Sequence, residues 1–211
     1  MRAGELRNKA KLWLRTKYPQ ALITHELSLA EWGGALVDVA AVCEDHIVGI
    51  EIKGEGDSPA RLGLQGGMYS RVCRSMYLLA DESVRKKCVA AIPPMWGELR
   101  VANGREDVDR YEVCPASGLT RSKYNHSDKT GYGLAPVALA AMPWTREYRT
   151  FSAALGYEVP RTKADCISAV IATSPLRKIE RAVCEVLRQR NWETKQIERP
   201  LEASLSTGEG P

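Results

Sequence analysis

Two apolar runs separated by a short polar break limit the possible folds of this chain more than any other feature. The runs cover residues 36–43 and 47–53, each contains several β-branched side chains, and Glu44 and Asp45 lie between them. β-Branched residues pack well on a pleated surface, and a polar break between two such runs is typical of a turn. The pattern therefore predicts two antiparallel strands joined as a β-hairpin.

Three charged residues lie within these predicted strands. Side chains alternate between the two faces of a strand, so Glu51 and Lys53 project to one side while Ile50 and Ile52 point to the other. Asp38 lies in the partner run, where an ionised carboxylate is costly to bury without a cation beside it. A metal ion and a lysine are the two cations that we expect there. A solvated cluster of ion pairs on the hairpin surface is the alternative.

An aspartate on one strand followed by Glu-x-Lys on the next resembles the PD-(D/E)xK nuclease superfamily, although Val37 stands where many members carry proline. The resemblance implies an α/β fold in which a restriction-endonuclease-like mixed sheet is flanked by helices. It also implies that Asp38, Glu51 and the carbonyl of Ile52 bind Mg²⁺ or Mn²⁺, which prefer hard oxygen ligands. Lys53 would then orient or deprotonate the attacking water, or offset phosphate charge.

A Gln-x-x-x-Tyr pattern follows the second run after a short loop. Gln65 and Tyr69 are four residues apart and share one face of a predicted helix, although Gly63, Gly66 and Gly67 weaken that prediction. The RecB-like branch of the superfamily has such a helix in this place, and there the two residues help to position the metal site and the DNA strand. An ordinary amphipathic helix is the alternative.

Acidic residues are concentrated around the predicted hairpin. Residues 19–60 hold eight acidic residues and one lysine, whereas the whole chain has a net charge of +4. An acidic pocket in a basic protein suits metal-dependent cleavage, because the pocket attracts cations and the surroundings attract the nucleic-acid backbone. The resemblance further implies an accessory metal ligand before the hairpin. Glu26 matches best, with Glu31 as the alternative.

The order of predicted elements divides the chain into a nuclease-like core at residues 1–136, a helical extension at 137–200 and a disordered tail at 201–211. The extension either packs on the core or binds DNA. The predicted elements are a helix at 3–18, strands at 75–80, 88–92, 96–101 and 110–113, a short helix at 81–87, a polar linker at 114–136, and helices at 137–141, 145–154, 162–173 and 175–190.

One face of the first predicted helix is basic. It is either solvated or in contact with phosphates, and its members are Arg7, Lys9, Lys11, Arg15 and Lys17.

The remaining features concern the cellular setting. The chain contains no apolar run of about 18 residues and no signal-like N-terminal segment, so we expect a cytoplasmic protein without a membrane span. Its six cysteines include no C-x-x-C pair, which favours reduced thiols over a zinc site or a disulfide framework. The oligomeric state stays open, a homodimer included.

The sequence thus predicts an Mg²⁺- or Mn²⁺-dependent nuclease that acts on DNA, in DNA repair, recombination or mobile-element biology. It is most similar to small stand-alone RecB-like or MmcB-like proteins. The alternative is a protein of the same fold that binds DNA or assembles a complex without cleaving its partner.

Overall fold

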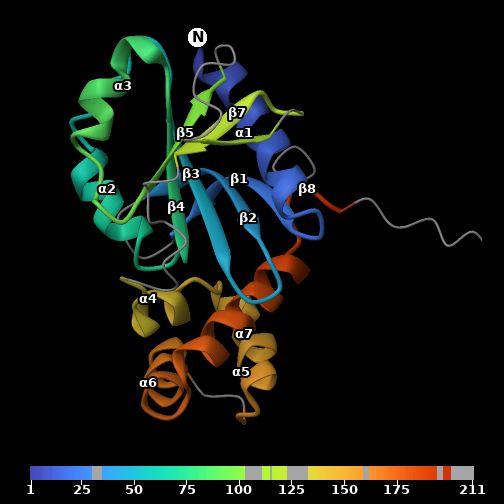
Figure 1. Ribbon diagram of the computed structural model, residues 1–211. Coiled ribbons are helices and arrows are strands. Elements are labelled where there is room, and N and C mark those ends of the chain that lie inside the picture. Colours follow the sequence, from blue (N-terminus) through green and yellow to red (C-terminus); the bar gives the residue numbers. More distant parts are fainter. Residues whose placement is uncertain are drawn as a thin grey trace, which may run out of the picture.

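The computed structural model describes residues 1–29, 35–102, 111–114, 116–122, 133–158, 162–193 and 197–200. A mixed β-sheet with helices on both faces forms one half of the molecule, and a group of helices forms the other half (Figure 1). The predicted α/β class with a C-terminal helical extension is therefore confirmed. The elements in chain order are α1 (Ala3–Lys17), β1 (Leu22–Ser28), β2 (Leu36–Val42), β3 (Ile47–Lys53), α2 (Leu62–Tyr69), β4 (Ser75–Ala80), α3 (Glu82–Val89), β5 (Gly97–Val101), β6 (Tyr111–Cys114), β7 (Leu119–Ser122), α4 (Pro136–Ala141), the 3₁₀ helix η1 (Thr145–Glu147), α5 (Tyr148–Leu155), α6 (Lys163–Thr173), α7 (Leu176–Gln189) and β8 (Ile197–Glu198).

The described part of the sheet has eight strands in the order β6-β7-β5-β4-β3-β2-β1-β8. The predicted hairpin is confirmed, because β2 and β3 pair antiparallel from Val39–Ile50 to Val42–Ile47. Strands β3, β4 and β5 run parallel to one another, and all other neighbouring pairs in the described sheet are antiparallel. The parallel centre places α2 and α3 as crossover connections, which is why these helices lie against the sheet.

The two faces of the sheet are covered by different helices. Helix α1 packs Leu6, Ala10 and Leu14 into one apolar cluster with residues of β2 and β3. The other face belongs to a second cluster that includes residues of α2 and α3 and continues into helices α4–α7. In Figure 1, α1 accordingly lies on the opposite side of the sheet from α2 and α3. No helix in the described part of the chain is both long and apolar enough to cross a membrane.

A buried ion pair joins the helical extension to the sheet. The guanidinium of Arg74, just before β4, donates through Nε to Glu180 Oε1 of α7 at 3.1 Å, and its Nη2 also contacts this carboxylate. Glu180 is fully buried, and Arg190 of the same region pairs with Glu147 at 2.7 Å. Unpaired buried charges are costly, so these pairs fix how α7 sits against its neighbours.

Two sequence predictions of local structure are wrong. Residues 88–92 do not form a strand, because α3 continues to Val89 after Asp81 caps its first turn by accepting a hydrogen bond from the Ser83 amide. The predicted linker 114–136 contains strand β7, which pairs with both β5 and β6 and buries Leu119. The tail 201–211 lies outside the described residues.

Candidate active site

The alternation of β3 separates its apolar from its charged residues as predicted. Ile50 and Ile52 pack into the cluster beneath α1, while the side chains of Glu51 and Lys53 meet each other, with Lys53 Nζ 2.7 Å from Glu51 Oε1. Glu51 is only 2% exposed and the Lys53 side chain 11%. The lysine is thus held as an ion pair at the floor of a pocket.

Asp38 joins this pair because the β2–β3 ladder stops short of it. The last main-chain pair on this side is Val39–Ile50, and the Ile52 amide beyond it donates to Asp38 Oδ2 at 2.7 Å. A carboxylate therefore replaces a backbone carbonyl as the acceptor at the end of the hairpin. This hydrogen bond holds the Asp38 side chain beside Glu51.

The proximity of the two carboxylates changes their protonation. Burial, followed by the negative charge of Asp38, raises the pKa of Glu51 to about 7, although Lys53 opposes the shift. Burial also raises the pKa of Asp38, against the opposing effects of the Ile52 hydrogen bond, Lys53 and Arg7. One oxygen of the pair, Glu51 Oε2, is buried and has no hydrogen-bond partner among the described residues.

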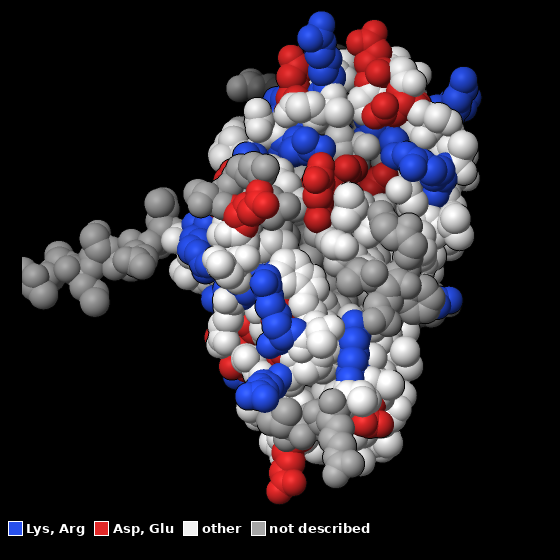
Figure 2. Space-filling model, turned by 180° about the vertical axis from the view of Figure 1, so that it is seen from behind, with Lys and Arg blue, Asp and Glu red and all other residues white. Residues whose placement is uncertain are grey.

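The walls of the pocket come from both faces of the sheet. Ala3 and Arg7 of α1 form one wall, and Arg61 and Gln65 at the start of α2 contribute to the other, around a cavity of about 410 Å³. Figure 2 shows acidic side chains with basic ones on either side in the upper half of the molecule, the half that holds the sheet. The pocket itself has this character, with an acidic floor and cationic walls.

The two residues of the Gln-x-x-x-Tyr pattern have different places. Gln65 lines the pocket, and its buried Oε1 has no partner among the described residues. Tyr69 is fully buried, stacks on Trp96 with ring centroids 6.1 Å apart, and donates its hydroxyl to the Leu36 carbonyl at 2.6 Å. Tyr69 therefore ties α2 to the start of β2, two residues before Asp38.

Glu26 is not brought into the pocket. It lies on β1 between the pairs His25–Val39 and Leu27–Val37, so its position in the strand is opposite that of Asp38. Its side chain is nevertheless exposed and does not line the cavity. Its φ of 53° is unusual for a residue other than glycine. The structure thus gives no support to Glu26 as a ligand, and the alternative, Glu31, lies outside the described residues.

Comparison with known proteins identifies a family but no activity. Residues 8–201 match the family model described as Bacteriophage P4 protein cII. The chain belongs to this family. No curated protein and no solved structure matches the chain. The family match covers the whole acidic floor together with Gln65 and Tyr69, whereas Arg7 lies one residue before it.

The carboxylate oxygens on the floor of the pocket are hard ligands, which a divalent cation would prefer. Because they are few, such a cation would also need oxygen ligands from a bound substrate. Two carboxylates meet there, and no group of three or more His, Cys, Asp or Glu side chains that could hold a metal occurs among the described residues. Mg²⁺ keeps several waters and is commonly bound through one or two carboxylates plus substrate phosphates. Glu51 Oε2, buried beside Asp38, is a hard oxygen of the kind that such an ion would prefer.

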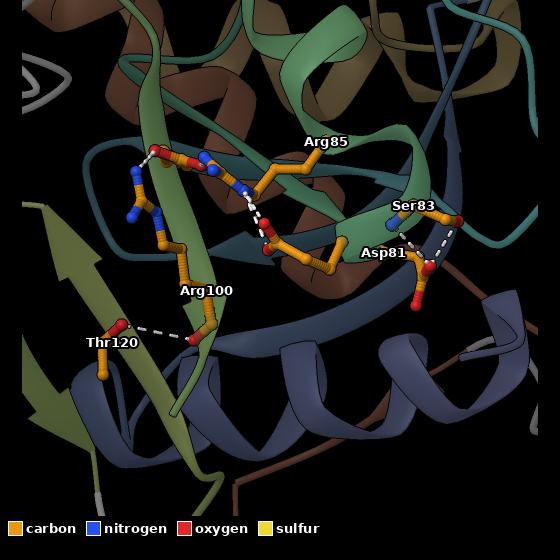
Figure 3. Close-up of polar contacts among 7 residues, drawn as sticks. Asp81, Ser83, Arg85, Arg100 and Thr120 are labelled. Atoms are coloured by element: carbon orange, nitrogen blue, oxygen red, sulfur yellow. Dashed lines mark hydrogen bonds and ion pairs between the residues drawn. The ribbon is translucent and has the colours of Figure 1, made fainter. Parts of the chain in front are cut away.

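A second buried carboxylate, that of Glu98, has different ion-pair partners from Glu51. Glu98 of β5 is 4% exposed and is paired with Arg85 at 2.8 Å and with Arg100 at 3.0 Å. Figure 3 shows this network between α3 and β5, with Thr120 donating to the Arg100 carbonyl. Glu98 is neutralised by two guanidinium groups, whereas Glu51 has one lysine and a neighbouring acid. Of these two buried carboxylates, Glu51 is the one with less positive charge beside it, since Arg7 lies 4.0 Å from Asp38 and Lys53 alone contacts Glu51.

Sequence reasoning missed two residues of the site. Arg7 was expected on a basic helix face but without any link to Asp38, and its Nη2 lies 4.0 Å from Asp38 Oδ1. Arg61 carried no signal in the sequence, because it lies between the Glu-x-Lys strand and the Gln-x-x-x-Tyr helix and belongs to neither pattern. The pairing of α1 with α2 across the end of the sheet is a tertiary feature.

Proposed function

We propose that this chain is a metal-dependent nuclease that hydrolyses phosphodiester bonds in DNA with Mg²⁺ or Mn²⁺ as its cofactor. The observation that supports this most is the meeting of Asp38, Glu51 and Lys53 in one pocket, where a buried carboxylate oxygen has no partner. Membership of a bacteriophage family favours a role in mobile-element biology, with DNA repair or recombination as the related setting.

Each residue of the floor has a distinct role in this proposal. Asp38 and Glu51 would hold the metal, helped by the carbonyl of Ile52, a residue that lines the same pocket. When bound, the metal supplies Lewis acidity at the phosphate and lowers the pKa of a coordinated water. Lys53, an ion-paired cation at 2.7 Å from Glu51, orients the attacking water or offsets charge on the phosphate, and it could deprotonate that water only after giving up its own proton.

Gln65 and Tyr69 act on the geometry of the pocket. Gln65 lines the same cavity, and its buried amide oxygen, without a partner among the described residues, could accept a hydrogen bond from a metal-bound water or a substrate donor. Tyr69 holds the start of β2 through the Leu36 carbonyl, and this contact fixes the position from which Asp38 projects. Its buried hydroxyl makes it a positioning residue.

A second candidate function is favoured by one specific observation. The guanidinium of Arg7 lies 4.0 Å from Asp38 and supplies positive charge from the chain itself. The described residues contain no group of three or more His, Cys, Asp or Glu side chains placed to hold a metal, and Asp57, which also lines the pocket, accepts a hydrogen bond from the Gly54 amide at 2.7 Å. A protein that binds DNA or assembles a complex without cleavage would keep this arrangement. The two candidates differ in turnover.

Cleavage assays separate the two candidates. Supercoiled and single-stranded DNA would be incubated with Mg²⁺ or Mn²⁺ and the wild type, Asp38→Asn or Lys53→Ala. We expect the wild type to cleave and both variants to lose at least about a hundredfold in rate, because proton-transfer catalysis alone contributes about 10²–10⁴. Glu44→Gln is the matched control, since this exposed carboxylate lies in the turn at the far end of the same two strands. Intact DNA with a wild type that binds it well would reject the nuclease.

A further inference from the structure

Two arginines face the pocket from helices on opposite faces of the sheet. Arg7 lies on α1 and Arg61 immediately precedes α2, and both line the cavity above the acidic floor. The Nε atom of Arg7 is buried without a partner, and the 4.0 Å from its Nη2 to Asp38 exceeds a hydrogen bond. Arg61 is exposed and has no ion-pair partner among the described residues. The Arg61 guanidinium is therefore available to phosphate oxygens, and Arg7, whose side chain is 35% exposed, can present its two terminal nitrogens to them.

The depth of the floor restricts what can reach it. Glu51 is 2% exposed and Lys53 has 11% of its side chain exposed, so a reacting phosphate has to enter the cavity. The cavity, of about 410 Å³, lies within the size range of small-molecule pockets and holds one nucleotide-sized group rather than a double helix. A base-paired strand reaches such a floor only after it separates from its partner strand, at a cost of about 1.4 kcal/mol per base-pair step.

Exposed apolar side chains lie in the pocket wall and near Arg61. Leu36, 40% exposed, lines the cavity, whereas Leu64, 74% exposed, lies outside its lining, on α2 one helical turn after Arg61. Unpaired bases present flat apolar faces that pack on such side chains, whereas a duplex turns its charged backbone outward. Two leucines beside two arginines thus match a strand with accessible bases.

We propose that the pocket takes an unpaired DNA strand, with Arg7 and Arg61 binding phosphates on either side of the acidic floor and Leu36 and Leu64 packing against its bases. This inference rests on the proposed function, because it names the substrate of the same site. A continuous duplex would be cleaved about tenfold more slowly for each base pair that has to open, from the cost per base-pair step given above.

Binding and cleavage would be measured on three DNAs of one sequence: a single strand, a closed duplex and a duplex with one splayed end. Anisotropy in Ca²⁺ gives affinities, and Mg²⁺ gives rates. We expect the single strand and the splayed end to exceed the duplex at least tenfold in both. Arg7→Gln and Arg61→Gln should each weaken single-strand binding about fivefold and reduce its logarithmic salt slope by about 0.7, as expected for one lost phosphate contact.

Matched variants separate this role from damage to the fold. Arg177→Gln removes the same charge from an exposed position on α7 and should change affinity less than twofold. Arg7→Lys should recover part of the lost affinity, because it keeps the charge but not the planar fork. Leu64→Asp, at an exposed site, should weaken single-strand binding with an unchanged melting temperature.

The outcomes distinguish this inference from the nuclease proposal. Duplex affinity equal to or above that of the single strand would overturn the inference, and so would unchanged affinity in both arginine variants. Tighter binding of an RNA strand of the same sequence would overturn the assignment to DNA. A single-strand preference that depends on Arg7 and Arg61, without cleavage of any DNA, would support the inference and reject the nuclease.

Discussion

Replacing Glu51 by glutamine should stabilise the metal-free protein above neutral pH. In the folded chain the pKa of Glu51 is about 7, compared with an ordinary value of 4.5, because the group is buried beside Asp38. The folded state therefore keeps its proton through a pH range in which the unfolded state has already lost it. The wild type loses stability as the pH rises from about 4.5 to about 7, and the loss is complete above that range.

The size of the effect follows from the shift. Each pKa unit corresponds to 1.36 kcal/mol, so ionised Glu51 lowers the free energy of unfolding by about 3 kcal/mol at pH 8. Glutamine removes this cost but leaves Lys53 without its partner at 2.7 Å, which offsets part of the gain. We expect Glu51→Gln to be about 1–3 kcal/mol more stable than the wild type at pH 8 and no more stable below pH 4.5.

Urea unfolding in EDTA at pH 4.5 and pH 8, followed by tryptophan fluorescence, measures this difference. Glu98→Gln is the opposite control, because Glu98 neutralises Arg85 and Arg100, and its loss should destabilise by about 3 kcal/mol at pH 8. Added Mg²⁺ should stabilise the wild type at pH 8 and leave Glu51→Gln almost unchanged. A Glu51→Gln protein that is less stable than the wild type at pH 8, or a difference independent of pH, would refute the reasoning.

Three further predictions test contacts near the pocket and at the junction between the sheet and α7. Glu180→Gln should cost about 3 kcal/mol in urea unfolding, because it leaves Arg74 unpaired at the junction of the sheet and α7, and Arg74→Met combined with Glu180→Leu should recover much of this loss. Tyr69→Phe removes the 2.6 Å hydrogen bond to the β2 backbone and should cost about 1 kcal/mol together with a severalfold lower cleavage rate, with unchanged stability counting against the contact. Gly66→Ala should lower the melting temperature and cost about 1–3 kcal/mol, because its Cβ would lie 2.6 Å from the Pro93 ring, and a neutral effect would show that this loop shifts freely.

The floor of the pocket could be predicted from the sequence because it is local in the chain. Asp38, Glu51 and Lys53 lie on two strands joined by a tight turn, so strand alternation and hairpin pairing place them together. The same logic placed Gln65 and Tyr69 on one side of a helix, but only the structure shows that Gln65 lines the cavity while Tyr69 is buried beneath it. Exposure within a helix face depends on what packs against it.

The walls of the pocket could not be predicted, because they depend on contacts between distant segments. Arg7 reaches the floor only because α1 crosses one face of the sheet while α2 covers the other, and no pattern in either helix encodes that meeting. Strand β7 was missed for a similar reason. Its short sequence, Leu-Thr-Arg-Ser, is mostly polar and becomes a strand because β5 and β6 offer backbone groups that need partners.

The floor of the pocket is negatively charged and its walls are positively charged. We expect this arrangement to make the binding of a cation depend on the binding of a phosphate. Two carboxylates with raised pKa values favour any added positive charge, and Lys53 supplies only part of it. Arg7 is near enough to moderate the charge of Asp38 but too distant, at 4.0 Å, to bond to it. A phosphate that binds the wall arginines removes that moderation and leaves the floor more negative. A divalent cation held by Asp38 and Glu51 would supply the missing positive charge, and so we expect DNA and metal each to strengthen the binding of the other.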